Sequence, residues 1–266
     1  MEIVVCIKQV PDTTDVKVDP MTKTLMRDGV RSILNPFDAF AVEEALRVKE
    51  RAGGRVTAVT MGPPQARAVL EEALAMGADE AVMLSHRAFA GSDTLATSYA
   101  LSQAIKRIGR FSLVVCGKQA SDGDTAQVGP GIAVRLGIPQ IMFVVKVREI
   151  GKSEIVVDRA TEEGYETVAA PLPCLISVTK DANVPRFPSF SGKVRARRAH
   201  IPAWSADDIG CDHERIGLDG SPTWVDRIFA PEHKAGSTPV PATDENIEKA
   251  VGAIAAELSE IWESRS

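Results

Sequence analysis

Short apolar stretches alternate with helix-like segments along the first 180 residues, and this alternation restricts the possible folds most strongly. Residues 2–10, 55–61, 81–85 and 111–116 have the length and β-branching of buried strands. Helical patterns lie between them, at 36–52, 62–76 and 94–108. Strands separated by helices predict an α/β fold with a mostly parallel, doubly wound sheet and right-handed crossovers. Such sheets bind ligands beyond the carboxyl ends of their strands.

The later part of the chain has a different character. Residues 141–147 and 154–159 read as two strands of a hairpin, and 173–179 as a further strand. A proline-rich loop with two aromatic residues follows at 184–192, and a basic stretch at 193–200. The tract 203–243 is rich in Gly, Pro, Asp and Ser. We expect it to be disordered or to lie on a partner, and its aromatic residues Trp204, Trp224 and Phe229 favour a partner.

A final helix is predicted at 244–264, with Asp244 as its N-cap. Its apolar stripe comprises Ile247, Val251, Ile254, Leu258 and Ile261. Docking of this stripe on the chain's own body and docking on another subunit are both compatible with the pattern. The sequence therefore predicts two parts. One is an α/β domain at 1–202 that includes the loop at 184–192, and the other is a C-terminal arm and helix at 203–266.

Composition excludes several classes of protein. The 266 residues carry a net charge of −5, which disfavours a nucleic-acid-binding surface. No apolar run is long enough to span a membrane. The four cysteines form no Cys-x-x-Cys pair, so we expect no metal site. The chain begins with a strand pattern rather than a secretory signal, which predicts a reduced, cytoplasmic protein.

Residues 117–130 read Gly-Lys-Gln-Ala-Ser-Asp-Gly-Asp-Thr-Ala-Gln-Val-Gly-Pro and connect a strand to a helix. Gly123 and Gly129 let backbone N–H groups turn towards an anion, and the next helix contributes the positive end of its dipole. Thr125 and Gln127 add side-chain donors. The loop suits a phosphate or pyrophosphate, although it matches neither the P-loop nor the Gly-x-Gly-x-x-Gly fingerprint. A plain turn that uses glycine for geometry is equally compatible with its composition.

Several segments together resemble the beta subunits of electron transfer flavoproteins. No segment is specific alone, but their order and spacing are; they lie at 3–11, 28–30, 35–38, 41–45, 61–63, 73–79, 117–125 and 185–187. The resemblance covers nearly the whole chain. It implies a fold of the adenine-nucleotide α-hydrolase-like type and a heterodimer with a larger alpha subunit that holds one FAD. The beta subunit itself holds an adenine nucleotide.

The family divides according to that nucleotide. Housekeeping members hold a structural AMP, whereas electron-bifurcating members hold a second FAD. Two segments here resemble the bifurcating group. One is the Asp-Gly-Asp-Thr loop at 122–125, and the other is the stretch 87–98, which in that group contacts the part of FAD beyond its AMP portion. The resemblance then implies that the second FAD takes hydride from NADH. It divides the electron pair between a low-potential acceptor (ferredoxin or flavodoxin) and the alpha-subunit FAD, which serves an acceptor such as an acyl-CoA dehydrogenase.

Two alternatives stay open: a housekeeping beta subunit with AMP, and a non-redox regulator that binds an adenine nucleotide. In the bifurcating case we expect the protein to supply orientation and electrostatics, and the flavin to supply the chemistry. No catalytic acid–base pair is evident.

The resemblance also implies the site residues. Adenine and ribose are expected at Cys6, Asn35, Phe37, Asp38 and Met61. Ribose and phosphates are expected at Gly117, Gln119, Asp122, Gly123, Thr125, Ala126, Gln127 and Val128. The carboxylates of Asp122 and Asp124 should bind ribose hydroxyls, backbone amides or loop residues rather than phosphate. The extended cofactor is expected at Arg87, Asp93, Thr94 and Thr97, and the acceptor dehydrogenase at Phe187 and Phe190, unless both rings fold back onto the core.

Overall fold

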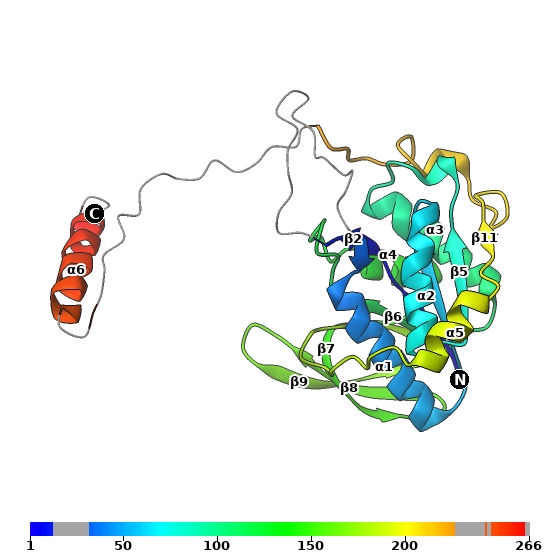
Figure 1. Ribbon diagram of the computed structural model, residues 1–266, viewed down its shortest axis with the longest axis horizontal. Helices are drawn as coiled ribbons and strands as arrows, with labels where there is room; N and C mark the ends of the chain where they lie inside the picture. Colours follow the sequence, from blue (N-terminus) through cyan, green and yellow to red (C-terminus); the bar gives the residue numbers. More distant parts are fainter. Residues whose placement is uncertain (13–31, 227–242, 244–245, 264–266) are drawn as a thin grey trace. The chain divides into compact units, whose positions relative to one another are not determined.

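The computed structural model describes residues 1–12, 32–226, 243 and 246–263 (Figure 1). The chain divides into two compact units, Met1–Ile228 and Phe229–Ser266. Among the described residues, no helix is long and apolar enough to cross a bilayer. No group of three or more His, Cys, Asp or Glu side chains within the described part is arranged to hold a metal ion.

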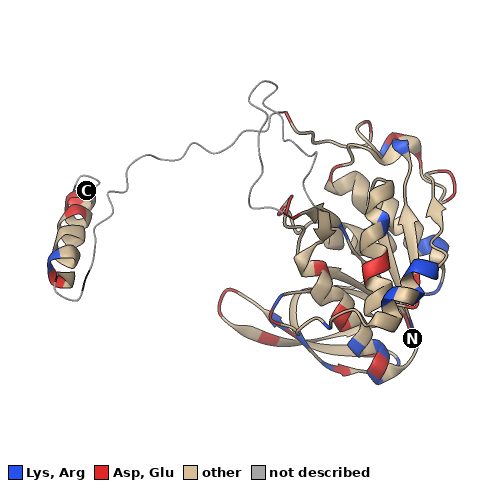
Figure 2. Ribbon diagram, in the orientation of Figure 1, with Lys and Arg blue, Asp and Glu red and all other residues tan. Residues whose placement is uncertain are grey.

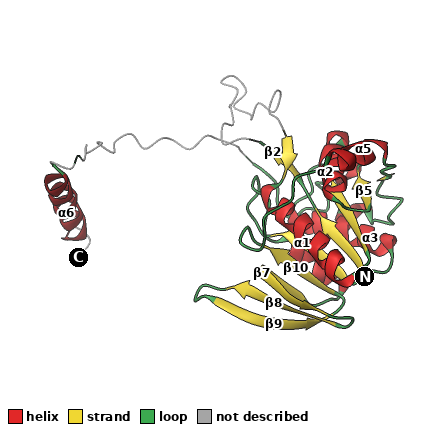
Figure 3. Cartoon of the chain, turned by 60° about the horizontal axis from the view of Figure 1, so that its bottom comes forward, coloured by secondary structure: helices red, strands yellow, loops and turns green. Residues whose placement is uncertain are grey.

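A nine-stranded sheet forms the centre of the first unit, in the order β11-β5-β4-β1-β6-β10-β7-β8-β9. The pairs from β11 to β7 are parallel, and β7, β8 and β9 pair antiparallel (Figure 3). The strands span β1 Glu2–Cys6, β4 Arg55–Met61, β5 Glu80–Leu84, β6 Leu113–Gly117, β7 Gln140–Ile150, β8 Glu154–Ala160, β9 Tyr165–Pro171, β10 Cys174–Val178 and β11 Ala203–Trp204. The predicted α/β fold with a mostly parallel sheet is confirmed.

Helices cover both faces of this sheet because side chains along each buried strand alternate between them. In β1, Ile3 and Val5 face the cluster that includes α1 and α2, whereas Val4 and Cys6 face the cluster of α3 and α4. The helices of the first unit span α1 Pro36–Ala52, α2 Arg67–Met76, α3 Thr94–Ile108, α4 Val128–Leu136 and α5 Phe190–Arg198, with short 3-10 turns at η1 Pro64–Ala66, η2 Arg87–Phe89 and η3 His213–Arg215.

Strand β7 changes its pairing at Phe143. This residue has φ of 62°, which is unusual for a bulky side chain, and the register with β10 shifts at the same level. The buried Ser177 hydroxyl holds the bend by accepting the Phe143 N–H at 2.9 Å. The pairing of β7 with β8 begins at Val144, which also pairs with Val178 of β10, so the bend lies where the parallel and antiparallel parts of the sheet meet.

Three local expectations differ from the structure. The first strand ends at Cys6, and Gln9–Pro11 forms a separate strand, β2, paired antiparallel with β3 (Ser32–Leu34). Strand β9 was not expected. The second half of the predicted loop at 184–192 begins helix α5, which includes Phe190 and the basic stretch.

Residues 203–226, which the sequence analysis assigned to the arm, pack on the first unit of this same chain. Strand β11 pairs with β5, and the side chains that follow it enter the α3-side cluster; they are Ala206, Ile209, Cys211 and Ile216. Disorder, one of the two expectations for 203–243, is therefore wrong for this part, while contact with a partner stays a prediction; Trp224 is 73% exposed. Residue Phe229 lies outside the described residues.

The described part of the second unit is mainly helix α6, Ile247–Glu263. Its apolar stripe is exposed at Ile247, Val251, Ile254, Leu258 and Trp262. The predicted N-cap Asp244 and the side chain of Ile261 lie outside the described residues. Docking of this helix on an alpha subunit stays a prediction.

Candidate functional site

Asp38 joins the ends of two central strands to the start of α1. Its Oδ2 accepts the backbone N–H of Lys8, which follows β1, at 2.7 Å. Its Oδ1 lies against Gly117, the last residue of β6. A β-carbon at position 117 would clash with Oδ1 and with the backbone of Phe37. Burial raises the pKa of Asp38 to about 7, although hydrogen bonds from Lys8, Asn35 and Gly117 oppose the shift.

Asn35 binds the backbone of the predicted phosphate loop through its side-chain amide. Its Nδ2 donates to the Gln119 carbonyl at 2.8 Å, and its Oδ1 accepts the Ser121 N–H at 3.1 Å. The side chain is almost fully buried. Because both ends of the amide bind the loop, Asn35 fixes the loop backbone, and its contact with adenine or ribose stays a prediction.

The acids of the loop bind protein groups. Asp122 pairs with the Lys8 ammonium at 2.6 Å, and Asp124 accepts from the Gln119 side chain. Gln119 belongs to the loop, whereas Lys8 lies outside it and was not among the expected partners of these acids. Lys8 was missed as a site residue; the signal was a cation directly after the first strand, close to a loop with two acids.

The backbone of this loop has the geometry of an anion site. Asp124 and Ala126 have φ of 52° and 54°, the left-handed conformation that turns neighbouring N–H groups to one side. At Gly123 a β-carbon would meet nothing within 4 Å, so space is open above the backbone. Helix α4 begins at Val128, next to the exposed Thr125 and Gln127. These features fit the phosphates of a nucleotide.

The stretch 87–98 reaches the same loop at one point. The Thr94 hydroxyl donates to Gln127 Oε1 at 3.0 Å, which connects the first turn of α3 to the end of the phosphate loop. Thr97 lies one turn further along and is partly exposed. Arg87 lies in η2, after β5, and is exposed; within the described part of the chain, no hydrogen bond or ion pair connects it to the loop.

Asp93 is occupied by structural contacts. Its Oδ1 caps α3 by accepting the N–H groups of Leu95 and Ala96, and its Oδ2 accepts from the N–H and hydroxyl of Thr223. Burial alone would raise the pKa of Asp93, but these hydrogen bonds outweigh it and hold the pKa below its ordinary value. Thr223 was missed, because nothing in the sequence connects positions 93 and 223.

The remaining predicted residues are Cys6 and Met61, at the carboxyl ends of β1 and β4, and Phe37, in the first turn of α1. Cys6 and Cys116 stand side by side on paired strands, and the hydrogen bond with Cys6 together with burial raises the pKa of the Cys116 thiol. Met61 and Phe37 are half-buried. The four cysteines form no disulfide. The edge thus combines an apolar side with an open loop, as an adenine nucleotide requires.

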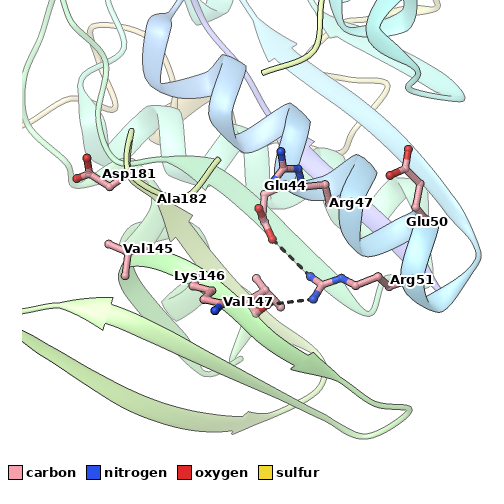
Figure 4. A pocket seen from close by; sticks show the side chains of 9 residues that line it. All are labelled: Glu44, Arg47, Glu50, Arg51, Val145, Lys146, Val147, Asp181 and Ala182. Carbon is pink, nitrogen blue, oxygen red and sulfur yellow. Dashed lines mark hydrogen bonds and ion pairs between the residues drawn. The ribbon is translucent and has the colours of Figure 1, made fainter. Parts of the chain in front are cut away.

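One cavity of about 550 Å³ lies elsewhere in the first unit (Figure 4). It is bounded by α1, β7 and residues 181–182, and it contains none of the predicted site residues; its lining is Glu44, Arg47, Glu50, Arg51, Val145, Lys146, Val147, Asp181 and Ala182. Arg51 crosses it, donating to the Val147 carbonyl at 3.0 Å and lying 3.5 Å from Glu44. We assign it no role in nucleotide binding.

Comparison with known proteins agrees with this geometry. A family model for the electron transfer flavoprotein domain matches residues 22–209. The chain is 53% identical over 226 residues to the electron transfer flavoprotein subunit beta of Thermoanaerobacterium thermosaccharolyticum, which covers 85% of this chain and 86% of the relative.

Two further relatives have other names. Protein FixA of Bradyrhizobium diazoefficiens is 50% identical over 242 residues, covering 88% of this chain and 84% of its own. The caffeyl-CoA reductase-Etf complex subunit CarD of Acetobacterium woodii is 48% identical over 261 residues, covering 98% of both chains. The family model and the extent of these matches confirm the resemblance found in the sequence. This chain belongs to the electron transfer flavoprotein family, as a beta subunit.

Proposed function

We propose that this beta subunit holds a second FAD and belongs to an electron-bifurcating heterodimer. The observation that carries the proposal is the contact between Thr94 and Gln127 beside the open backbone at Gly123. This arrangement offers room and directs the Gln127 amide group, whose Nε2 is a donor, past the first phosphate, where AMP ends and the rest of FAD begins. Relatives named FixA and caffeyl-CoA reductase-Etf complex subunit support the same reading.

In this proposal, different residues bind different parts of the cofactor. Cys6, Phe37 and Met61 form the apolar side for adenine, and Asp38 holds the ends of β1 and β6 in register beneath it. The backbone from Gly123 to Gln127 and the first turn of α4 receive the pyrophosphate. Thr94, Thr97 and Arg87 face the extended part of the cofactor. Asp93 acts through them by capping α3.

The chemistry belongs to the cofactor. When bound, the flavin supplies acceptance of two electrons from NADH and their division between a low-potential acceptor (ferredoxin or flavodoxin) and the FAD of the alpha subunit. The chain orients the cofactor and binds partners. We propose Phe187 and Phe190 as contacts for an acceptor such as an acyl-CoA dehydrogenase, and a cytoplasmic location.

Acid extraction of the purified heterodimer, followed by a count of FAD and AMP, tests this proposal. Two FAD molecules and no AMP per heterodimer are expected. One FAD with one AMP would replace the proposal by the housekeeping alternative, in which Thr94 and Asp93 only begin a helix. A colourless protein with bound AMP would instead support a non-redox regulator, a role that family membership does not favour.

A further inference from the structure

The segment just before the two exposed aromatic residues is bound tightly to α1. Asn183 Nδ2 donates to the Phe40 carbonyl at 3.1 Å and to Glu44 Oε2 at 3.0 Å. The backbone N–H of Arg186 donates to Glu43 Oε2 at 3.1 Å. The chain is therefore held on the helix up to the residue that precedes Phe187.

The Arg186 guanidinium strengthens this attachment. It binds both carboxylate oxygens of Glu43, at 2.8 and 3.2 Å, and Glu50 Oε1 at 2.6 Å. The Glu43 side chain is only 4% exposed. Burial would raise the pKa of Glu43, but hydrogen bonds from Arg186 and Arg47 outweigh it and lower the pKa. The pair is thus ionised and geometrically fixed.

A second attachment begins on the other side of the loop. Ser189 Oγ caps α5 by accepting the Gly192 N–H at 2.9 Å, and Gly192 lies directly against the Ala75 carbonyl of α2. Arg195 donates to the Leu74 and Ala78 carbonyls at 2.7 and 3.3 Å, where α2 ends. Helix α5 is therefore fixed to α2 along its length.

Only Phe187 and Pro188 lie between the two attachments, and Phe187 and Phe190 are 95% and 85% exposed. The φ of Pro188 is restricted by its ring. A short, stiff connection therefore joins the segment 183–186, which is bound to α1, to helix α5, which is bound to α2. It keeps both rings in solvent, because neither ring can reach the core unless one of these attachments breaks. Presenting an aromatic group in advance reduces the ordering cost of binding.

We infer that Arg186 is a positioning residue for partner recognition, which sets the orientation of the adjoining Phe187 through Glu43 and Glu50, while the second attachment fixes Phe190. This inference rests on the proposed function, since it takes these rings as the contact for an acceptor dehydrogenase. A purely stabilising Arg186 would instead affect unfolding without changing the mobility of the loop in the native state.

The first measurement is hydrogen exchange of the peptide 183–192 in the complete heterodimer. Arg186→Gln should increase its exchange about tenfold, and Arg186→Lys should give a smaller increase, since an ammonium cannot bind Glu43 in the bidentate manner. Arg148→Gln is the matched control, because it removes a guanidinium paired with Asp158 on the antiparallel strands. Unchanged exchange in Arg186→Gln would overturn the inference. If that variant does not assemble, Glu50→Gln removes only the outer contact.

The second measurement is electron transfer to a purified acyl-CoA dehydrogenase. Arg186→Gln should raise KM for the dehydrogenase about tenfold, the size of a moderate hot spot, with kcat and flavin content unchanged. Phe187→Ala serves as the reference. If Phe187→Ala raises KM but Arg186→Gln does not, the positioning role is wrong. If Phe187→Ala has no effect either, the proposed partner contact of that ring is wrong, and the exchange data decide on the attachment alone.

Discussion

The Asp38 carboxylate packs directly on the α-carbon of Gly117, so that the start of α1 and the end of β6 meet without room for a side chain. Gly117→Ala should therefore lower the free energy of unfolding by about 1–3 kcal/mol, as overpacking does in a tight core. Urea unfolding measures this. Gly123→Ala is the matched control, because its β-carbon would meet nothing within 4 Å. Equal stability of the two variants would contradict the account.

Asp38 should make stability depend on pH. Its pKa is about 7 in the folded state against an ordinary value of 3.8, so the folded protein binds this proton more tightly than the unfolded chain does. Its stabilising contribution is therefore complete at low pH and is lost as the pH rises towards 7, by up to about 1.4 kcal/mol per pH unit. In Asp38→Asn this loss should be absent. Parallel profiles of unfolding free energy between pH 4 and 8 would refute the shift.

The hydroxyls at the start of α3 should select FAD over AMP. Replacing Thr94 and Thr97 together with Val keeps their shape but removes both donors. We expect loss of the beta-site flavin and retention of the alpha-site flavin, at a cost of about 1–3 kcal/mol per unsatisfied contact. Extraction of cofactors from the heterodimer measures this. Ser102→Ala is the control, since that hydroxyl binds only the Tyr99 carbonyl of its own helix; unchanged flavin in the double variant would weaken the bifurcating proposal.

Phe190→Ala should weaken electron transfer to the acceptor dehydrogenase by about 2 kcal/mol or more, the loss typical of a central aromatic contact. Flavin content and NADH oxidation with artificial acceptors should stay unchanged. Tyr165→Ala, which removes an exposed aromatic residue from β9, provides the comparison. Equal transfer rates in Phe190→Ala and wild type would leave the loop without a role in recognition.

The basic residues of α5 should accelerate this encounter, but Arg195 contributes little because it binds the carbonyl groups at the end of α2. Arg195 is exposed like Lys193, Arg197 and Arg198, but its guanidinium is held by these contacts. Figure 2 shows the basic residues along α5 in blue. Reversing the charge of Lys193 and Arg197 should slow transfer at low salt and remove its salt dependence. Stopped-flow rates at several ionic strengths test this, and a salt dependence that survives the reversal would exclude steering.

Patterns within short segments predicted much of the fold. The strand at 55–61 and the helix that ends near residue 52 are confirmed, because proline, glycine and β-branched runs mark their ends. The mostly parallel pairing followed from the alternation of strands with helices, but the order of the strands in the sheet did not. The loop at 117–130 connects a strand to a helix as expected, and its binding of phosphate stays a prediction.

Contacts between distant positions were not predictable in this way. Trp204 completes the sheet beside β5, and Thr223 ties Asp93, yet both lie in a tract whose composition suggested a loose arm. Asn35 was expected to face the nucleotide, but both atoms of its amide hold residues 119–121. Such roles depend on which distant segments contact each other in the folded chain. The periodicity of apolar residues within one segment does not report these contacts.

The bend at Phe143 also separates strands that pair with near neighbours in sequence from strands that pair with distant ones. Strands β7, β8 and β9 follow one another directly, so their pairing closes only short loops, whereas β1 must find partners at 55–59 and 113–116. Closing long loops costs more entropy and slows folding. We expect amides of β8 to gain protection before those of β1 in pulse-labelled refolding; protection of β1 first would contradict this order. The antiparallel strands would then serve as an early template for the slower parallel core.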